Sequence, residues 1–149
     1  MILTGNEIHE QVRRGRIRIS EFDPARLSPN SYDLCLAPIV LQYLDEVLDP
    51  ATEARTRPID LSTAPYRMQP NEFLLGRSAA RISTDSYVPI LHAKSGIARR
   101  GLFVHVTGDL LQMGCDDCPS LQLFATLPIV LTASMSIAQI SFWQPYGAS

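Results

Sequence analysis

A short polar segment in the middle of the chain has the residue types that bind anions. Lys94-Ser95-Gly96 begins what we interpret as a single helical turn ending near Gly101. Ser95 could cap this turn, and its free backbone N–H groups, with Lys94 and Arg99 nearby, could bind a phosphate. The same residues could also form only a capped turn with solvated charges. The spacing alone leaves both interpretations open.

The residues that follow could complete such a site. His105 lies in the apolar run "LFVHV", which we interpret as a strand. A single His in such a run could be a hydrogen-bonded core residue or a catalytic one. Thr107-Gly108 then leads into a turn, where a glycine lets a flat ligand approach the backbone closely.

A zinc site is the alternative chemistry to consider. Cys115 and Cys118 form a C-x-x-C pair, which supplies two of the four ligands that structural zinc needs. Zinc-dependent cytidine deaminases carry H-x-E and P-C-x-x-C. The three His contexts here are "HEQ", "HAK" and "HVT", and Gly114 precedes Cys115. We therefore expect no zinc and reduced cysteines.

Short strands must position most of these residues. One helix is expected at 5–14, because Thr4 and Glu7 fit a capping box and Gly15 is a natural stop. Alternation in "SYDLCL" places Tyr32, Leu34 and Leu36 on one face. Residues 44–58 are expected to form an exposed loop. Further strands are expected in "RIRIS", "EFLLGRS", "YVPILHA", "LFVHVTG", "SLQLFA", "PIVLTA" and "AQISFW". The predicted class is all-β with one N-terminal helix.

Composition limits the function. The chain has 149 residues, of which 46% are hydrophobic and 19% charged, which suits a single globular domain at 1–149. Its net charge of -2 argues against binding a nucleic acid polymer. The apolar runs fall short of the roughly 20 residues of a membrane helix, and the N-terminus does not resemble a signal peptide. We expect a cytoplasmic protein with no membrane association.

Several motifs together resemble a known family. "AKSGIARRGLFVHVTG" is similar to the signature of the dCTP deaminase family, part of the dUTPase-like superfamily. "MILTGNEIHEQVRRGRIRI" resembles the opening helix and strand of that family, and "SPNSYDLCLAP" resembles its Asn-Ser-Tyr-Asp-Leu-x-Leu strand. "LPIVLTASMSIAQISFWQP" resembles its last core strands. The resemblance extends from residue 1 to about residue 146 in the expected order.

The resemblance implies a fold, an assembly and residue roles. It implies a dUTPase-like distorted β-barrel, assembled as a homotrimer with active sites between subunits. The phosphates of a pyrimidine nucleotide would be faced by Lys94, Ser95 and the adjoining Gly96. Mg²⁺ would accompany the triphosphate. Arg99 would support the catalytic water or the developing charge. His105 and Thr107 would shape the pocket, and the backbone near Gly108 would read the pyrimidine edge. Water would attack the cytosine C4, and ammonia would leave.

Two glutamines depart from the family pattern. Counting from "VHVTG" places Gln122 where the family has a Glu that moves the proton in deamination. A Gln amide is nearly isosteric but cannot accept that proton. Gln112 stands where relatives have an Asp that holds the sugar 3′-hydroxyl, although its amide could still bind a hydroxyl. Since the chain ends at "FWQPYGAS", we also expect little of the family's C-terminal lid and weaker triphosphate binding.

Two hypotheses follow for the function. The first is a dCTP deaminase-like hydrolase that acts on a cytosine deoxynucleotide, converting dCTP to dUTP with altered catalytic groups. The second is a catalytically silent relative that binds a pyrimidine nucleotide or serves only as a structural partner. The resemblance favours a nucleotide ligand in both hypotheses, while the two glutamines favour the second.

Overall fold

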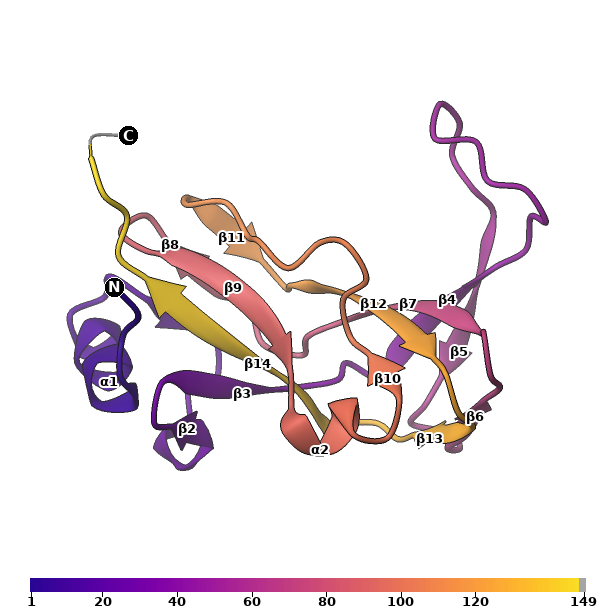
Figure 1. The fold of residues 1–149 in the computed structure, drawn as a ribbon, viewed down its shortest axis with the longest axis horizontal. Helices are drawn as coiled ribbons and strands as arrows, with labels where there is room; N and C mark the ends of the chain where they lie inside the picture. Colours follow the sequence, from indigo (N-terminus) through magenta and orange to yellow (C-terminus); the bar gives the residue numbers. More distant parts are fainter. Residues whose placement is uncertain (148–149) are drawn as a thin grey trace.

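The computed structural model describes residues 1–147 and begins with helix α1 at Gly5–Arg13 (Figure 1). The Thr4 hydroxyl oxygen caps the helix by accepting a hydrogen bond from the Glu7 N–H at 3.3 Å. The Glu7 carboxylate does not reach back; it accepts a bond from Gln11 Nε2 at 2.5 Å. Gly15 follows the helix with φ of +72°, a conformation that favours glycine. The predicted helix is therefore confirmed, with its end one residue earlier.

The rest of the described chain is built mainly from short strands. They are β1 Arg18–Ile19, β2 Leu27–Ser28, β3 Ser31–Cys35, β4 Ile39–Tyr43, β5 Thr56–Asp60, β6 Tyr66–Met68, β7 Phe73–Arg77, β8 Ile82–Thr84, β9 Val88–Ala93, β10 Leu102–Phe103, β11 Cys115–Asp117, β12 Ser120–Ala125, β13 Ile129–Leu131 and β14 Ser136–Trp143. A 3₁₀ turn, η1, spans Pro24–Arg26, and a four-residue helix, α2, spans Ser95–Ala98. The predicted mainly β class is confirmed.

A four-stranded antiparallel sheet in the order β2-β3-β14-β9 forms one side of the fold (Figure 1). Its long central strand β14 places Gln139 opposite Asp33 of β3 and His92 of β9. The predicted face of β3 is confirmed, because Tyr32, Leu34 and the following Leu36 are fully buried in the core. Smaller sheets, β1-β8-β11 and β13-β6, complete the fold.

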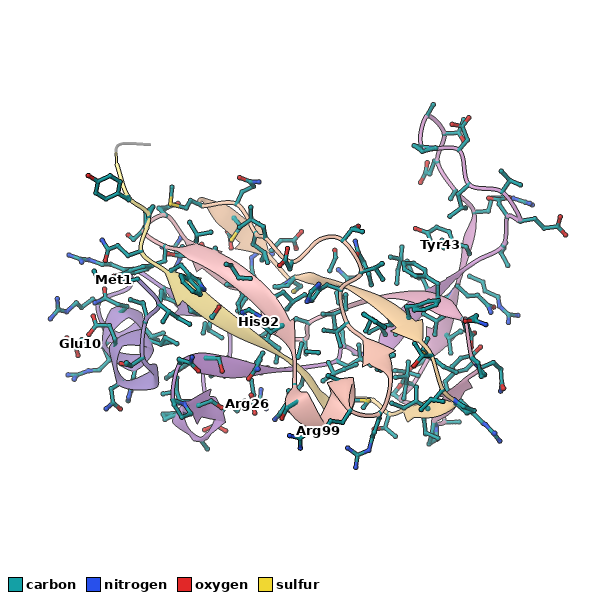
Figure 2. All side chains as sticks on the ribbon, in the orientation of Figure 1. Met1, Glu10, Arg26, Tyr43, His92 and Arg99 are labelled. Atoms are coloured by element: carbon teal, nitrogen blue, oxygen red, sulfur yellow. The ribbon has the colours of Figure 1, made fainter. Side chains whose placement is uncertain are left out.

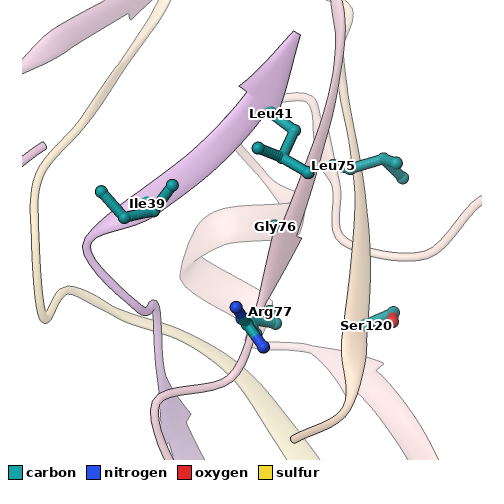
Figure 3. Close-up of a pocket in the computed structure, with 6 residues that line it drawn as sticks. All are labelled: Ile39, Leu41, Leu75, Gly76, Arg77 and Ser120. Carbon is teal, nitrogen blue, oxygen red and sulfur yellow. The ribbon is translucent and has the colours of Figure 1, made fainter. Parts of the chain in front are cut away.

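The other large sheet, in the order β10-β12-β7-β4-β5, has two unlike faces. Leu121 and Leu123 of β12 point into the core and are fully buried, whereas the alternate residues face outward. We call this second side the outer face. In register it carries Ile39, Leu41, Leu75, Phe103, Gln122 and Phe124. Figure 3 shows a pocket of about 320 Å³ on it, lined by Ile39, Leu41, Leu75, Gly76, Arg77 and Ser120.

Two predicted boundaries are wrong. The loop predicted at 44–58 is shorter, because Thr56 to Pro58 already pair with β4 as part of β5, and the resulting hairpin projects from the body (Figure 1). The strand predicted for "LFVHVTG" stops after Phe103. His105 therefore lies outside any strand, in an irregular segment whose hydrogen bonds are described below.

Gly5 is a position where lack of a side chain decides stability. A Cβ there would lie 2.2 Å from the backbone oxygen of Ser28, and the Gly5 N–H donates to the Pro29 carbonyl at 2.8 Å. Alanine is the better helix former, but the backbone contact leaves it no room, so we expect Gly5→Ala to destabilise the fold by about 1–3 kcal/mol. Urea unfolding followed by circular dichroism measures this. The exposed neighbour serves as the control, since Asn6→Ala should change stability far less. An unchanged midpoint for Gly5→Ala would contradict the packing.

None of the helices within residues 1–147 has the length and apolar character needed to cross a membrane. The short C-terminal tail expected from the sequence includes residues 148 and 149, which lie outside the described part.

Candidate active site

The side chain of Gln122 organises the segment that follows β10. Its backbone N–H donates to the Val104 carbonyl at 2.9 Å, which extends the β10–β12 pairing by one bond. Its side-chain Oε1 then accepts from the N–H groups of Val106 at 2.9 Å and Thr107 at 3.1 Å. Consecutive N–H groups of a strand point to opposite sides, so two that converge on one oxygen do not belong to a strand. The predicted strand therefore ends before Val106.

Gly108 lies against the other end of the same amide. A Cβ at Gly108 would be 3.2 Å from Gln122 Nε2, which is tighter than an ordinary contact. Its φ is outside the left-handed region, so the close approach of the amide, not backbone strain, explains the glycine. Within residues 1–147 the structure records no hydrogen-bond partner for Nε2. Gln122 and the backbone at Gly108, both predicted site elements, are therefore brought together.

A second pocket adjoins this segment on the side of α2. It has a volume of about 350 Å³ and is lined by Ala93, Ala98, Gly101, Leu102, Phe103, Val104 and His105. His105 is half-buried at its wall, whereas Thr107 and Gly108 are exposed. The predicted location of His105 at a pocket wall is compatible with this arrangement. Its role stays a prediction.

Lys94 has partners that the sequence did not suggest. Its ammonium group is bonded to a carboxylate oxygen of Asp33 in β3 and donates to Ser136 Oγ at 2.9 Å. The other carboxylate oxygen of Asp33 is buried without a hydrogen-bond partner. A phosphate bound beside Lys94 would therefore compete with Asp33 for the ammonium group.

The turn after Lys94 is confirmed as a short helix, but its predicted cap is wrong. The N-cap of α2 is Lys94, with no side-chain capping bond, and Ser95 is already its first residue. Ser95 is exposed and Gly96 is half-buried, and neither belongs to the residues that line the pocket of His105. Gly101 ends the turn with φ of +77°.

Arg99 and Gln112 are not joined to Gln122 within one chain. Arg99 is the exposed C-cap of α2, near the edge of the molecule (Figure 2). Gln112 is exposed in the loop before β11, where its carbonyl accepts from the Cys115 N–H at 3.1 Å. No contact recorded within residues 1–147 links either side chain to Gln122. The contacts of Gln122 within the described residues therefore do not place Arg99 or Gln112 beside it.

The cysteines of the C-x-x-C pair are free thiols. Burial raises the pKa of the Cys115 thiol, and the backbone N–H of Thr84 partly opposes this shift. A raised pKa keeps the thiol protonated at neutral pH, whereas zinc binds the thiolate. In the described part of the chain, no three His, Cys, Asp or Glu side chains gather as a metal site.

His92 of β9, next to Ala93 of the pocket of His105, is a polar residue whose contacts the sequence did not suggest. His92 is labelled in Figure 2. Its Nε2 lies 2.8 Å from Ser141 Oγ, which also accepts from Trp143 Nε1 at 2.9 Å. Burial lowers the pKa of His92; the charge of His105 lowers it further, and Asp109 opposes both. The register of β9 with β14, which places His92 near Ser141, was not visible in the sequence.

The lowered pKa of His92 predicts an acid-sensitive fold. His92 takes up a proton more easily in the unfolded chain than in the folded one. The free energy of unfolding therefore begins to fall as pH drops below the unfolded pKa of about 6.5. The loss is complete below the folded pKa of His92. His92→Gln should flatten the fall of the urea midpoint between pH 7.5 and 5. His9→Gln, on helix α1, is the control and should leave that fall unchanged. An equal fall in His92→Gln would contradict the prediction.

Comparison with known proteins decides the family. A family model described as dCTP deaminase-like matches residues 2–145. The chain belongs to the dCTP deaminase-like family.

Individual relatives of this dCTP deaminase-like chain agree. A dCTP deaminase of Rhodopirellula baltica is 36% identical over 149 residues, which are 100% of this chain and 75% of that protein. A dUMP-forming dCTP deaminase of Clostridium beijerinckii is 34% identical over 147 residues, covering 99% of this chain and 84% of that protein.

A solved structure supports the fold of the dCTP deaminase-like chain. The crystal structure of the 2'-deoxycytidine 5'-triphosphate deaminase from Agrobacterium tumefaciens superposes with a TM-score of 0.76 at 18% identity. The match covers 97% of this chain and 48% of the solved one, so this chain spans about half the length of that protein. The fold expected from the motif resemblance is thereby confirmed.

Proposed function

We propose that this chain binds a pyrimidine deoxynucleotide beside residues 104–108 and deaminates dCTP to dUTP. The observation that carries the proposal is the hydrogen-bonded unit of Gln122 with Val106 and Thr107, next to Gly108. By the count from "VHVTG", the family resemblance implies that Gln122 stands at the position of the family's catalytic Glu. The relatives from Rhodopirellula baltica and Clostridium beijerinckii, named as dCTP deaminases, support the substrate.

The side chains would divide the work as follows. Gln122 holds the segment at Val106 and Thr107 in place, but its amide cannot take the proton of the attacking water. Arg99 would stabilise the charge that develops at C4 when water adds and ammonia leaves. We therefore expect turnover that is slow because the general base is missing, a loss typically worth 10²–10⁴-fold.

Binding of the triphosphate would involve α2. Lys94 would exchange its partner Asp33 for a phosphate, beside the exposed hydroxyl of Ser95. Mg²⁺ would be held mainly by the phosphates, because the described chain has no cluster of three acidic, His or Cys ligands. When bound, Mg²⁺ would neutralise phosphate charge.

We also propose that the chain assembles as a homotrimer with sites between subunits. The outer face carries apolar side chains that a monomer would leave in water, including Phe103, which is 51% exposed. Gln122 stands on that face in register with Leu75. A neighbouring subunit seated there would cover the apolar surface and could bring Arg99 or Gln112 to the same site.

The proposal is tested by incubating the protein with dCTP and Mg²⁺. Release of ammonia in a coupled assay and formation of dUTP by chromatography are the expected results, and light scattering should give the mass of a trimer. Binding of dCTP without any ammonia release would contradict deamination. Failure to bind dCTP at millimolar concentration would contradict the site itself.

A further inference from the structure

The Gln122 amide presents only hydrogen-bond donors to a ligand at Gly108. Its Oε1 is occupied by two backbone N–H groups, those of Val106 at 2.9 Å and Thr107 at 3.1 Å. Rotating the amide by half a turn would set its NH₂ against these N–H groups, so the orientation follows from the two bonds. The free end is therefore Nε2, which carries two hydrogens and whose delocalised lone pair does not accept hydrogen bonds.

The free end lies against Gly108, the residue at which we propose that the flat ring of a base approaches. Nε2 would be 3.2 Å from a Cβ at Gly108, and glycine leaves that space open. Gln122 is half-buried and Gly108 is exposed, so the amide is reachable from solvent while partly shielded from it. A donor in such a location gains most from a ligand oxygen and loses most when it meets another donor.

The base edges of pyrimidines differ at C4 and at N3. Uracil has an accepting oxygen at C4 and a donating N–H at N3, whereas cytosine has a donating amino group at C4 and an accepting nitrogen at N3. Because residue 122 is proposed to lie beside the water that attacks C4, the C4 substituent is the group set against Nε2. An amide with only donors free matches the 4-oxo group and opposes the 4-amino group. A carboxylate at the same position would have the reverse preference, because it offers only acceptors.

We infer that Gln122 makes this a site that selects 4-oxo pyrimidine nucleotides, binding uracil nucleotides more tightly than cytosine nucleotides. The inference rests on the proposed nucleotide site and names Gln122 as its specificity-determining residue. In the reaction proposed above, the product would be held more tightly than the substrate. We expect dUTP to bind at least roughly 10-fold more tightly than dCTP, because dUTP gains a hydrogen bond from Nε2 whereas dCTP sets a donor against it.

Calorimetric titration with dUTP and dCTP in Mg²⁺ tests this inference on the complete chain. Chromatography after each titration verifies that dCTP was not converted. The expected result is a preference for dUTP in the natural protein. Gln122→Met keeps the side-chain length without donor or acceptor, and it should bring the two affinities close together. Circular dichroism confirms that the variant is folded.

The outcomes separate the inference from the proposed function. Equal or tighter binding of dCTP by the natural protein would overturn the inference and leave the nucleotide site standing. A preference for dUTP that persists unchanged in Gln122→Met would also overturn it, because the selection would then come from other groups. Failure of both nucleotides to bind at millimolar concentration would overturn the proposed function together with the inference.

Discussion

Replacement of Gln122 by Glu is expected to raise the rate of dCTP deamination by about 10²–10⁴-fold, the usual contribution of a positioned general base. The change is nearly isosteric, so one carboxylate oxygen can keep both bonds from Val106 and Thr107. The other oxygen then takes the position of Nε2 and can accept the proton of the attacking water. Bonds from two backbone N–H groups also lower a carboxyl pKa, which favours its ionised form at neutral pH.

The rate is measured as ammonia release at saturating dCTP. Gln144→Glu makes the same change of charge at an exposed residue after β14, away from β10 and β12 (Figure 1). It should leave the rate unchanged. A rate in Gln122→Glu no higher than that of the natural protein would show that the missing base does not limit the reaction, and would direct attention to Gln112.

Much of the fold could be predicted from local patterns. The capping signal at Thr4 and the stop at Gly15 define α1 because both act within a few residues of the helix end. The alternation at Tyr32 and Leu34 defines a buried strand face because side chains alternate along any strand. Both features depend on neighbours in sequence, which the sequence displays directly.

The site is less predictable because its decisive contacts join distant residues. The Gln122 side chain bonds the N–H groups of Val106 and Thr107, which are 16 and 15 residues away, and no periodicity in "LFVHVTG" signals that. Lys94 is paired with Asp33 across 61 residues of sequence. Family resemblance located these residues, but only the packing of strands shows which atoms they engage.

Arg99→Ala is expected to lower the rate of deamination by roughly 10²–10³-fold, because it removes a group that stabilises developing charge. The change is made in the Gln122→Glu background, so that turnover is fast enough to follow. Arg100→Ala is the matched control. Both arginines are exposed at the end of α2, but the Arg100 guanidinium is bonded to the Gly96 carbonyl of its own turn at 2.6 Å. Equal losses in the two variants would indicate a general effect of charge and contradict a role specific to Arg99.

A mixing experiment then asks which subunit supplies Arg99. The double variant Gln122→Glu with Arg99→Ala has the base but lacks the arginine, whereas the natural chain has the arginine but lacks the base. Suppose that each site combines residue 122 of one subunit with Arg99 of its neighbour in a ring. The two chains are then separated into subunits, mixed in equal amounts and re-assembled, and complete sites form at random. Activity should then return to about a quarter of that of Gln122→Glu alone, because half of the chains carry the base and half of their neighbours carry the arginine. If Arg99 acts within its own chain, no mixture can unite the two groups. Mixing would then restore nothing, and the site between subunits would be contradicted.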